Sequence, residues 1–177
     1  VTLLVIFSYL GTKQQIKTPP QPRVEGIQIV PTKTNSLSQS KKADVIKVVD
    51  GDTITVLLNG KKQTIRIIGI DTPETVDPRK PVQCYGKAAS DRAKELLSNK
   101  PVWLESDPTQ GNTDKYGRLL RYIFINGSDD YGLGAILEGY AHEYTYDLPY
   151  KYQAEYKKAE KAAMTAKIGL WADNACN

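Results

Sequence analysis

The sequence has 177 residues, of which 40% are hydrophobic and 25% are charged, a composition typical of one globular domain with an additional segment. Its mean hydropathy of -0.44 excludes a protein with several membrane spans. The formal net charge of +4 invites a nucleic-acid interpretation. Residues 1–42, however, carry six basic side chains and one acidic one, whereas residues 43–177 carry 18 basic and 19 acidic ones. Particular residues, and not the bulk charge of the domain, must therefore indicate any nucleic-acid site.

The N-terminal part of the sequence differs from the rest in composition. Val1–Leu10 is almost wholly apolar but too short to span a bilayer, which takes about 20 apolar residues. We expect it to be the end of a signal peptide or of an N-terminal membrane anchor, the alternative being a buried first strand. Residues 11–42 are polar, contain four prolines and show no sustained periodicity, which predicts a flexible linker. The folded domain is expected over 43–177.

Three strands are predicted at the start of this domain, at residues 45–49, 53–58 and 63–70, from their β-branched and other apolar side chains. Asp50–Asp52 separates the first two strands. Asn59–Gly60, a dipeptide typical of tight hairpins, separates the last two. The three strands should form an antiparallel meander.

The rest of the domain alternates between helical and strand patterns. Helices are predicted at 86–99, 131–138 and 150–167, where apolar residues recur at three- and four-residue steps. Further strands are predicted at 102–105 and 119–125. Short antiparallel strands with a helix after the third indicate an α+β, mainly β fold: a five-stranded OB-type barrel with about three helices packed on it.

Acidic residues gather at the expected ends of the first and third strands. Asp50 and Asp52 lie in the first turn, Asp71 follows the third strand, and Glu74 comes three residues later. Because these strand ends meet at one edge of a meander, we expect Asp52 and Asp71 to lie close together. Clustered carboxylates repel one another unless a hard cation lies among them, and oxygen ligands, including the Thr72 carbonyl, suit calcium or magnesium. The alternative is that these residues only form turns.

Basic and aromatic residues accompany the acidic ones. Arg66 alternates with apolar neighbours on the third strand, and Arg118 opens the fifth. Two guanidinium groups facing an acidic cluster suit phosphoryl chemistry, because each grips phosphate oxygens through parallel hydrogen bonds; ordinary surface ion pairs are the alternative. Tyr116, Tyr144 and Tyr146 are candidates for stacking on bases.

The two cysteines, Cys84 and Cys176, are too few for a zinc site even with the single histidine, His142. In an exported protein they would be expected to pair, the alternative being two unrelated free thiols.

Three segments in this order resemble the signature blocks of the thermonuclease (staphylococcal nuclease-like) family. These segments are Val49–Thr53, Arg66 with Asp71–Thr75, and Asp114–Arg118. In addition, Gly169–Trp171 is similar to the closing segment of that family. The resemblance covers residues 43–174.

The resemblance implies an OB barrel and a site with assigned roles. Calcium would be held by Asp52, Asp71 and the carbonyl of Thr72, with Asp50 behind these ligands. Glu74 would hold or activate the attacking water, and Arg66 and Arg118 would clamp the scissile phosphate. Substrate contacts would come from Lys80, Lys115, Tyr116, Tyr144 and Tyr146, the last two matching only if one residue is dropped after Gly139. The two cysteines, Cys84 and Cys176, would form a disulfide.

The resemblance therefore implies a calcium-dependent endonuclease that hydrolyses DNA and RNA with little sequence specificity and prefers single-stranded or unpaired substrate. We expect a secreted or extracytoplasmic monomer, with or without an N-terminal membrane tether. A non-catalytic binding module on the same fold and a tethered adhesion or scaffold domain are the alternatives.

Overall fold

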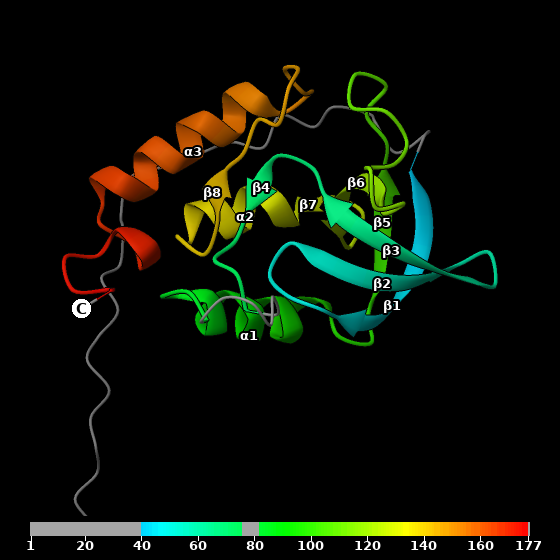
Figure 1. Ribbon diagram of the computed structural model, residues 1–177, viewed down its shortest axis with the longest axis horizontal. Coiled ribbons are helices and arrows are strands. Elements are labelled where there is room, and N and C mark those ends of the chain that lie inside the picture. The colour runs from blue at the N-terminus through cyan, green and yellow to red at the C-terminus, as the bar shows by residue number, and fades with distance from the viewer. Residues whose placement is uncertain (1–39, 76–81, 177) are drawn as a thin grey trace, which may run out of the picture. The chain divides into compact units, whose positions relative to one another are not determined.

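The computed structural model of the protein describes residues 40–75 and 82–176, and its centre is a closed barrel (Figure 1). The barrel strands are β1 (Lys41–Val48), β2 (Thr53–Leu58), β3 (Lys61–Ile67), β5 (Pro101–Glu105) and β6 (Leu119–Ile125). This confirms the five-stranded barrel expected from the sequence and is consistent with an OB fold.

The barrel closes through a pairing that the sequence pattern did not predict. β1 pairs antiparallel with β2 and β5, β2 pairs antiparallel with β3, and β5 pairs antiparallel with β6. The closing pair, β3 with β6, is parallel, with Arg66 opposite Leu120. The expectation of antiparallel strands throughout was wrong here, because the chain passes through a helix and β5 before β6 returns alongside β3.

Two strand boundaries differ from the sequence prediction. β1 begins at Lys41, so the last two residues of the expected linker belong to the barrel. β3 ends at Ile67, because Gly69 adopts a φ of +81° and bends the chain. A side chain at Gly69 would meet the ring of Tyr150 at 2.7 Å, so this bend has no room for one. After the bend, β4 (Ile70–Asp71) pairs with β8 (His142–Glu143). A further short strand, β7 (Asp129–Asp130), pairs antiparallel with the end of β6.

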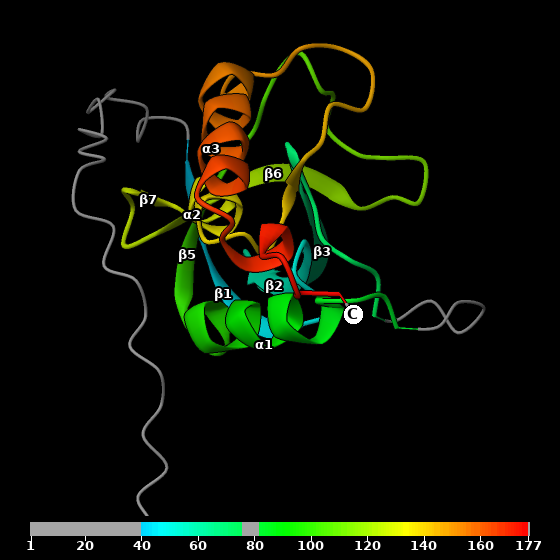
Figure 2. The same cartoon turned by 90° about the vertical axis from the view of Figure 1, so that its left-hand side faces the viewer.

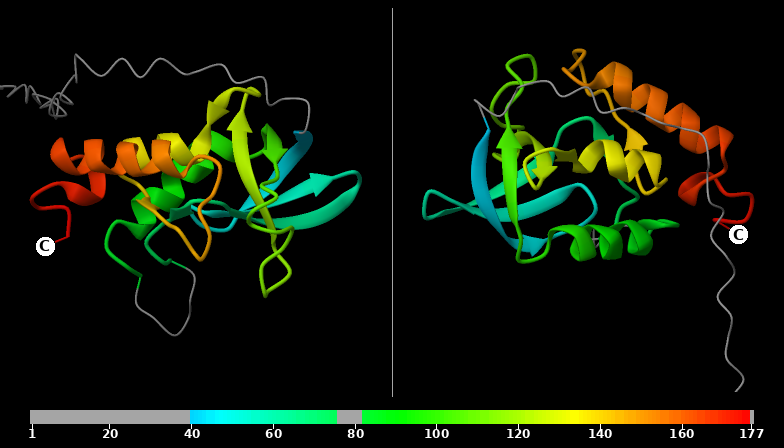
Figure 3. Two further views of the ribbon diagram at one scale, coloured as in Figure 1. Left: turned by 90° about the horizontal axis from the view of Figure 1, so that it is seen from above. Right: turned by 180° about the vertical axis from the view of Figure 1, so that it is seen from behind.

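Three α-helices lie near the residues expected for them. They are α1 (Gly86–Leu97), α2 (Tyr131–Leu137) and α3 (Gln153–Thr165), followed by the 3-10 turn η2 (Gly169–Trp171). Figure 2 shows α1 along the lower side of the barrel. The helix α3 packs against α2 and lies away from α1. The views in Figure 3 show the loop between β5 and β6 standing clear of the helices. Among the described residues, every helix is too short or too polar to cross a bilayer.

The barrel interior is filled by alternate residues of the strands. Val45, Ile54, Ile65 and Val102 are each at most 1% exposed. This alternation places Arg66, the neighbour of Ile65, on the outer face of β3, as its position between two apolar residues predicted.

Cys84, just before α1, forms a disulfide with Cys176 near the C-terminus. This confirms the pairing that the family resemblance implied and rules out two free thiols. The bridge closes 92 residues of sequence and ties the start of α1 to the segment after η2.

A buried carboxylate, Asp107, fastens the loop after β5 to the segment before α3. It is 2% exposed and accepts hydrogen bonds from Thr109 (N at 2.9 Å, Oγ1 at 2.8 Å), the Tyr122 hydroxyl (2.7 Å) and the Lys151 amide (2.8 Å). Burial by itself would raise the pKa of Asp107, but these hydrogen bonds to the charged form outweigh it and lower the pKa.

Replacement of Asp107 by asparagine is expected to lower the free energy of unfolding by about 1–3 kcal/mol near neutral pH, because the Lys151 N–H loses a charged acceptor. A lowered folded-state pKa stabilises above the unfolded value, and this contribution is lost as pH falls through the folded value. The difference between wild type and Asp107→Asn should therefore shrink below about pH 4. Urea unfolding of both proteins near neutral pH and below about pH 4 measures this difference in the free energy of unfolding. A difference that stays the same in acid would contradict the lowered pKa of Asp107.

Candidate active site

The Asp50–Asp52 turn, between β1 and β2, is held against the start of the segment after β4. The Asp52 amide donates to Asp50 Oδ1 at 3.1 Å, and the Tyr131 hydroxyl donates to the Gly51 carbonyl at 2.6 Å. A Cβ on Gly51 would meet Thr72 Cγ2 at 2.6 Å, so only glycine allows this approach. The packing of this turn brings Asp52 next to Thr72, so the role of the turn is not limited to reversing the chain direction.

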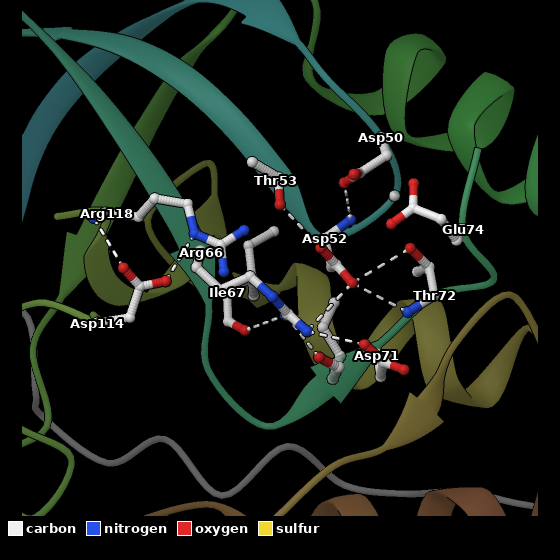
Figure 4. A network of polar contacts seen from close by, with 12 residues as sticks. Asp50, Asp52, Thr53, Arg66, Ile67, Asp71, Thr72, Glu74, Asp114 and Arg118 are labelled. Atoms are coloured by element: carbon white, nitrogen blue, oxygen red, sulfur yellow. Dashed lines mark hydrogen bonds and ion pairs between the residues drawn. The ribbon is translucent and has the colours of Figure 1, made fainter. Parts of the chain in front are cut away.

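Asp52 is joined directly to the segment that follows β4. Its Oδ2 accepts from the Thr72 amide at 3.0 Å and from Thr72 Oγ1 at 3.3 Å, while its Oδ1 accepts from Thr53 Oγ1 at 2.9 Å. Asp52 and Thr72 are 6% and 7% exposed. The ends of the first and third strands thus meet at one edge of the barrel, as the meander predicted (Figure 4).

Arg66 lies between the two carboxylates expected to bind a cation. Its Nη2 lies 2.9 Å from Asp71 Oδ1 and 3.3 Å from Asp52 Oδ2. Its Nη1 donates to the carbonyls of Ile67 at 2.9 Å and Ile70 at 2.7 Å. The guanidinium is therefore fixed in direction by the bend after β3, and among the described residues its Nε–H makes no hydrogen bond.

Two carboxyl groups of this cluster, Asp50 and Asp71, have raised pKa values. Burial, and then the negative charge of Asp52, raises the pKa of Asp50 to about 7. The same two causes, in the same order, raise the pKa of Asp71. A bound cation would relieve this repulsion, so the donor set fits a hard ion. No three His, Cys, Asp or Glu side chains in 40–75 and 82–176 converge on one point, so main-chain or water oxygens would have to complete the coordination.

Glu74 lies on the same side of Asp52 as Asp50 and Thr72, away from Arg118 (Figure 4). Its Oε1 accepts from the Thr75 amide at 2.8 Å, which limits the directions its carboxylate can take. The negative charge of Glu74 contributes to the raised pKa of Asp71, so the two carboxyl groups act on each other.

Arg118 approaches Arg66 from the other side of the site (Figure 4). Its Nε lies 2.6 Å from Asp114 Oδ2, and its amide donates to Asp114 Oδ1 at 2.9 Å. Asp114 Oδ1 also accepts from the Tyr116 amide at 2.9 Å, and Gly117 adopts a φ of +79°. Asp114 therefore shapes the turn and aims Arg118, a role that sequence reasoning missed although an Asp at the start of a turn is a recognised signal.

A pocket of about 560 Å³ opens beside these residues. Its lining includes Arg66, Asp71 and Arg118. Its remaining lining includes the expected substrate residues Lys115, Tyr116, Tyr144 and Tyr146, together with Gln110, Thr113 and Asp114. Lys80, the other expected substrate residue, lies outside the described residues.

The tyrosines of the pocket are available for stacking. Tyr116 and Tyr146 are 72% and 75% exposed, and the ring centroids of Tyr144 and Tyr146 are 6.4 Å apart. Lys115 Nζ and the Arg118 guanidinium lie 5.2 Å and 5.4 Å from the centre of the Tyr116 ring. Cationic and aromatic groups thus share one wall, an arrangement suited to phosphates and flat rings.

Other residues that the sequence left without a role are structural. Arg92 pairs with Glu138 through Nε at 2.7 Å, and Arg121 donates to Asn112 Oδ1 at 2.5 Å. His142 packs edge-on against Trp171 and lies 3.6 Å from Glu160.

Comparisons with known proteins show which family the chain resembles. A model of the family described as staphylococcal nuclease homologue matches residues 64–173. The chain is 43% identical over 145 residues to the thermonuclease of Staphylococcus hyicus, covering 81% of this chain and 84% of that protein. It is 41% identical over 127 residues to the thermonuclease of Staphylococcus intermedius, covering 72% and 74%.

A relative from another genus has a similar identity. The match to endonuclease YncB of Bacillus subtilis (strain 168) is 39% identical over 140 residues, covering 77% of this chain and 65% of that protein. With the barrel, the acidic edge and the two arginines in place, the chain belongs to the staphylococcal nuclease family.

Proposed function

We propose that the protein is a nuclease that hydrolyses phosphodiester bonds of DNA and RNA with little sequence specificity, and that it depends on calcium. The observation that carries the proposal is the position of Arg66, whose Nη2 contacts both Asp52 and Asp71 beside a pocket that Arg118 also lines. The relatives named thermonuclease and endonuclease support the same class of reaction.

Asp52, Asp71 and the carbonyl of Thr72 would hold the calcium ion, with Asp50 behind them. The raised pKa of Asp71 and the two carboxylates on one guanidinium support this assignment, because both features signal negative charge that a cation would neutralise. When bound, calcium would polarise a non-bridging oxygen of the substrate phosphate.

Arg66 would bind the same phosphate through the edge formed by Nε and Nη2. Its Nη1 is already used by the carbonyls of Ile67 and Ile70, which keep the group aimed at the site. Arg118 would contact the phosphate from the opposite side and stabilise the charge that grows on it. Asp114 contacts Arg118 through Nε, and within the described residues no hydrogen bond engages the two terminal nitrogens of Arg118, which would serve this purpose.

Glu74 would hold the attacking water and accept its proton. A carboxylate positioned within hydrogen-bond reach of the nucleophile is suited to general base catalysis. The hydrogen bond from the Thr75 amide to Glu74 Oε1 supports this role by holding the carboxylate in one orientation.

Lys115 and Tyr116 would contact a neighbouring phosphate and sugar. Tyr144 and Tyr146 would stack on bases. Lys80 is proposed to add a further basic contact to the substrate. Stacking requires an unpaired base, so single-stranded or locally unpaired substrate should be preferred. Aromatic faces accept every base, which accounts for the expected lack of sequence specificity.

We further propose that the enzyme is secreted or extracytoplasmic and acts as a monomer. The Cys84–Cys176 disulfide supports this location, because such bonds persist in oxidising compartments. Val1–Leu10, the proposed signal or membrane-anchor segment, lies outside the described residues, as does most of the linker at 11–42.

Digestion of single-stranded DNA with calcium and with a calcium chelator tests the proposal. We expect cleavage that the chelator abolishes and added calcium restores, without a change in the fold measured by circular dichroism. Cleavage that survives the chelator would contradict the calcium assignment. Tight binding of DNA without cleavage would instead identify a non-catalytic binding module, and neither binding nor cleavage would favour a scaffold domain.

A further inference from the structure

The segment between Gln83 and the start of α1 forms a support for the backbone of Glu74. The Glu74 amide donates to Gln83 Oε1 at 2.7 Å, and the Gln83 amide donates to the Glu74 carbonyl at 2.9 Å. Both polar groups of the Glu74 main chain are thus held by one residue nine positions later. Such a reciprocal pair fixes the position and the rotation of the peptide units on either side of the Glu74 Cα.

The support is close-packed on its other side. A Cβ on Gly86, the first residue of α1, would meet the carbonyl of Pro73 at 2.9 Å and Thr75 Cγ2 at 2.8 Å. The chain reaches Gly86 through Tyr85, whose φ of 66° makes the turn into the helix. The backbone of 73–75 therefore rests directly on the N-terminus of α1.

The disulfide anchors this support at its centre. Cys84 lies between Gln83 and Tyr85 and is bonded to Cys176. The C-terminal segment is in turn attached to the body of the domain, because the Leu170 amide donates to the Gly139 carbonyl at 2.8 Å. Movement of Gln83 relative to the barrel is thus restrained by a covalent bond next to it.

We propose that Gln83 is a positioning residue for the reaction: its side-chain carbonyl holds Glu74 where its carboxylate can orient the attacking water. This inference rests on the proposed function of Glu74. Gln83 is exposed to solvent, so water can replace its hydrogen bond with little loss of stability, but water cannot fix the Glu74 backbone. The role of Gln83 is therefore to set geometry rather than to stabilise the fold, and its loss should appear in kcat.

Replacement of Gln83 by methionine, which keeps the length of the side chain but removes the acceptor, tests this role. We expect kcat on single-stranded DNA to fall at least about tenfold while KM stays within about twofold, because misplacing a catalytic group by about 1 Å can cost a hundredfold. Gln83→Glu keeps an acceptor at the same reach and should retain kcat within about threefold. Gln63→Met, on β3, is the matched control and should behave as wild type, since the Gln63 side chain has no hydrogen bond to the described residues.

Amide hydrogen exchange provides a readout that does not depend on activity. The Glu74 N–H should exchange faster in Gln83→Met than in wild type, while amides of β2 and β3 keep their protection. Unchanged kcat in Gln83→Met despite faster exchange would overturn the positioning role, and so would a rise in KM alone or an equal loss in Gln83→Glu.

The proposed nuclease function is tested by outcomes different from those that test the role of Gln83. Wild type that does not cleave DNA with calcium, or Glu74→Ser that cleaves as fast as wild type, refutes the reaction assigned to this site. Active wild type, inactive Glu74→Ser and fully active Gln83→Met would refute only the inference about Gln83.

Discussion

Replacement of Glu74 by serine is expected to lower kcat on single-stranded DNA by about 10²–10⁴-fold, the contribution of a positioned general base. KM should change little, because Glu74 is proposed to hold water and not substrate. The free energy of unfolding should stay within about 1 kcal/mol of wild type, since Glu74 is not part of the buried core. Steady-state kinetics with calcium, together with urea unfolding of the same sample, measure both effects.

Arg66→Gly provides the contrasting variant. Arg66 contacts Asp52, Asp71 and the carbonyls of Ile67 and Ile70, so its removal leaves two carboxylates facing each other and two carbonyls without their donor. We expect loss of both activity and stability, the latter by at least about 2 kcal/mol. Glu74→Ser with wild-type activity, or with a stability loss as large as that of Arg66→Gly, would contradict the separation of roles.

The sequence predicted the parts of this site that depend on local pattern. β2 has the expected bounds, because its β-branched run is stopped by a turn at each end. The proximity of Asp52 and Asp71 followed from the geometry of a meander, in which alternate strand ends share an edge. Arg66 was placed outward by simple alternation with Ile65, which is fully buried.

The remaining features depend on contacts that no local pattern encodes. The parallel pairing of β3 with β6 arises from the path of the intervening chain. The two carbonyl acceptors of Arg66 come together only because Gly69 bends the chain after β3. Gln83 carries no motif, and its contact with Glu74 exists because the chain returns past the site before α1.

Removal of the disulfide is the prediction with the largest expected effect on stability. The double variant Cys84→Ser, Cys176→Ser should lose about 4–5 kcal/mol of unfolding free energy, because a bridge that closes 92 residues removes much of the entropy of the unfolded chain. Guanidinium unfolding of oxidised wild type, reduced wild type and the double variant measures it. The last two should agree, and a loss below about 1 kcal/mol would contradict the loop-entropy account.

The disulfide should also act on the reaction through the segment that it anchors. Because Cys84 adjoins Gln83, the double cysteine variant, assayed at a temperature where it is fully folded, should have a lower kcat with little change in KM. If this loss passes through Gln83, adding Gln83→Met should cost far less than it does in oxidised wild type, since the Glu74 backbone is already released. If the fold-loss in kcat of the combined variant equals the product of the losses caused by the double cysteine change and by Gln83→Met, the two act independently. The disulfide would then affect the enzyme by a route other than the hydrogen bonds between Gln83 and Glu74.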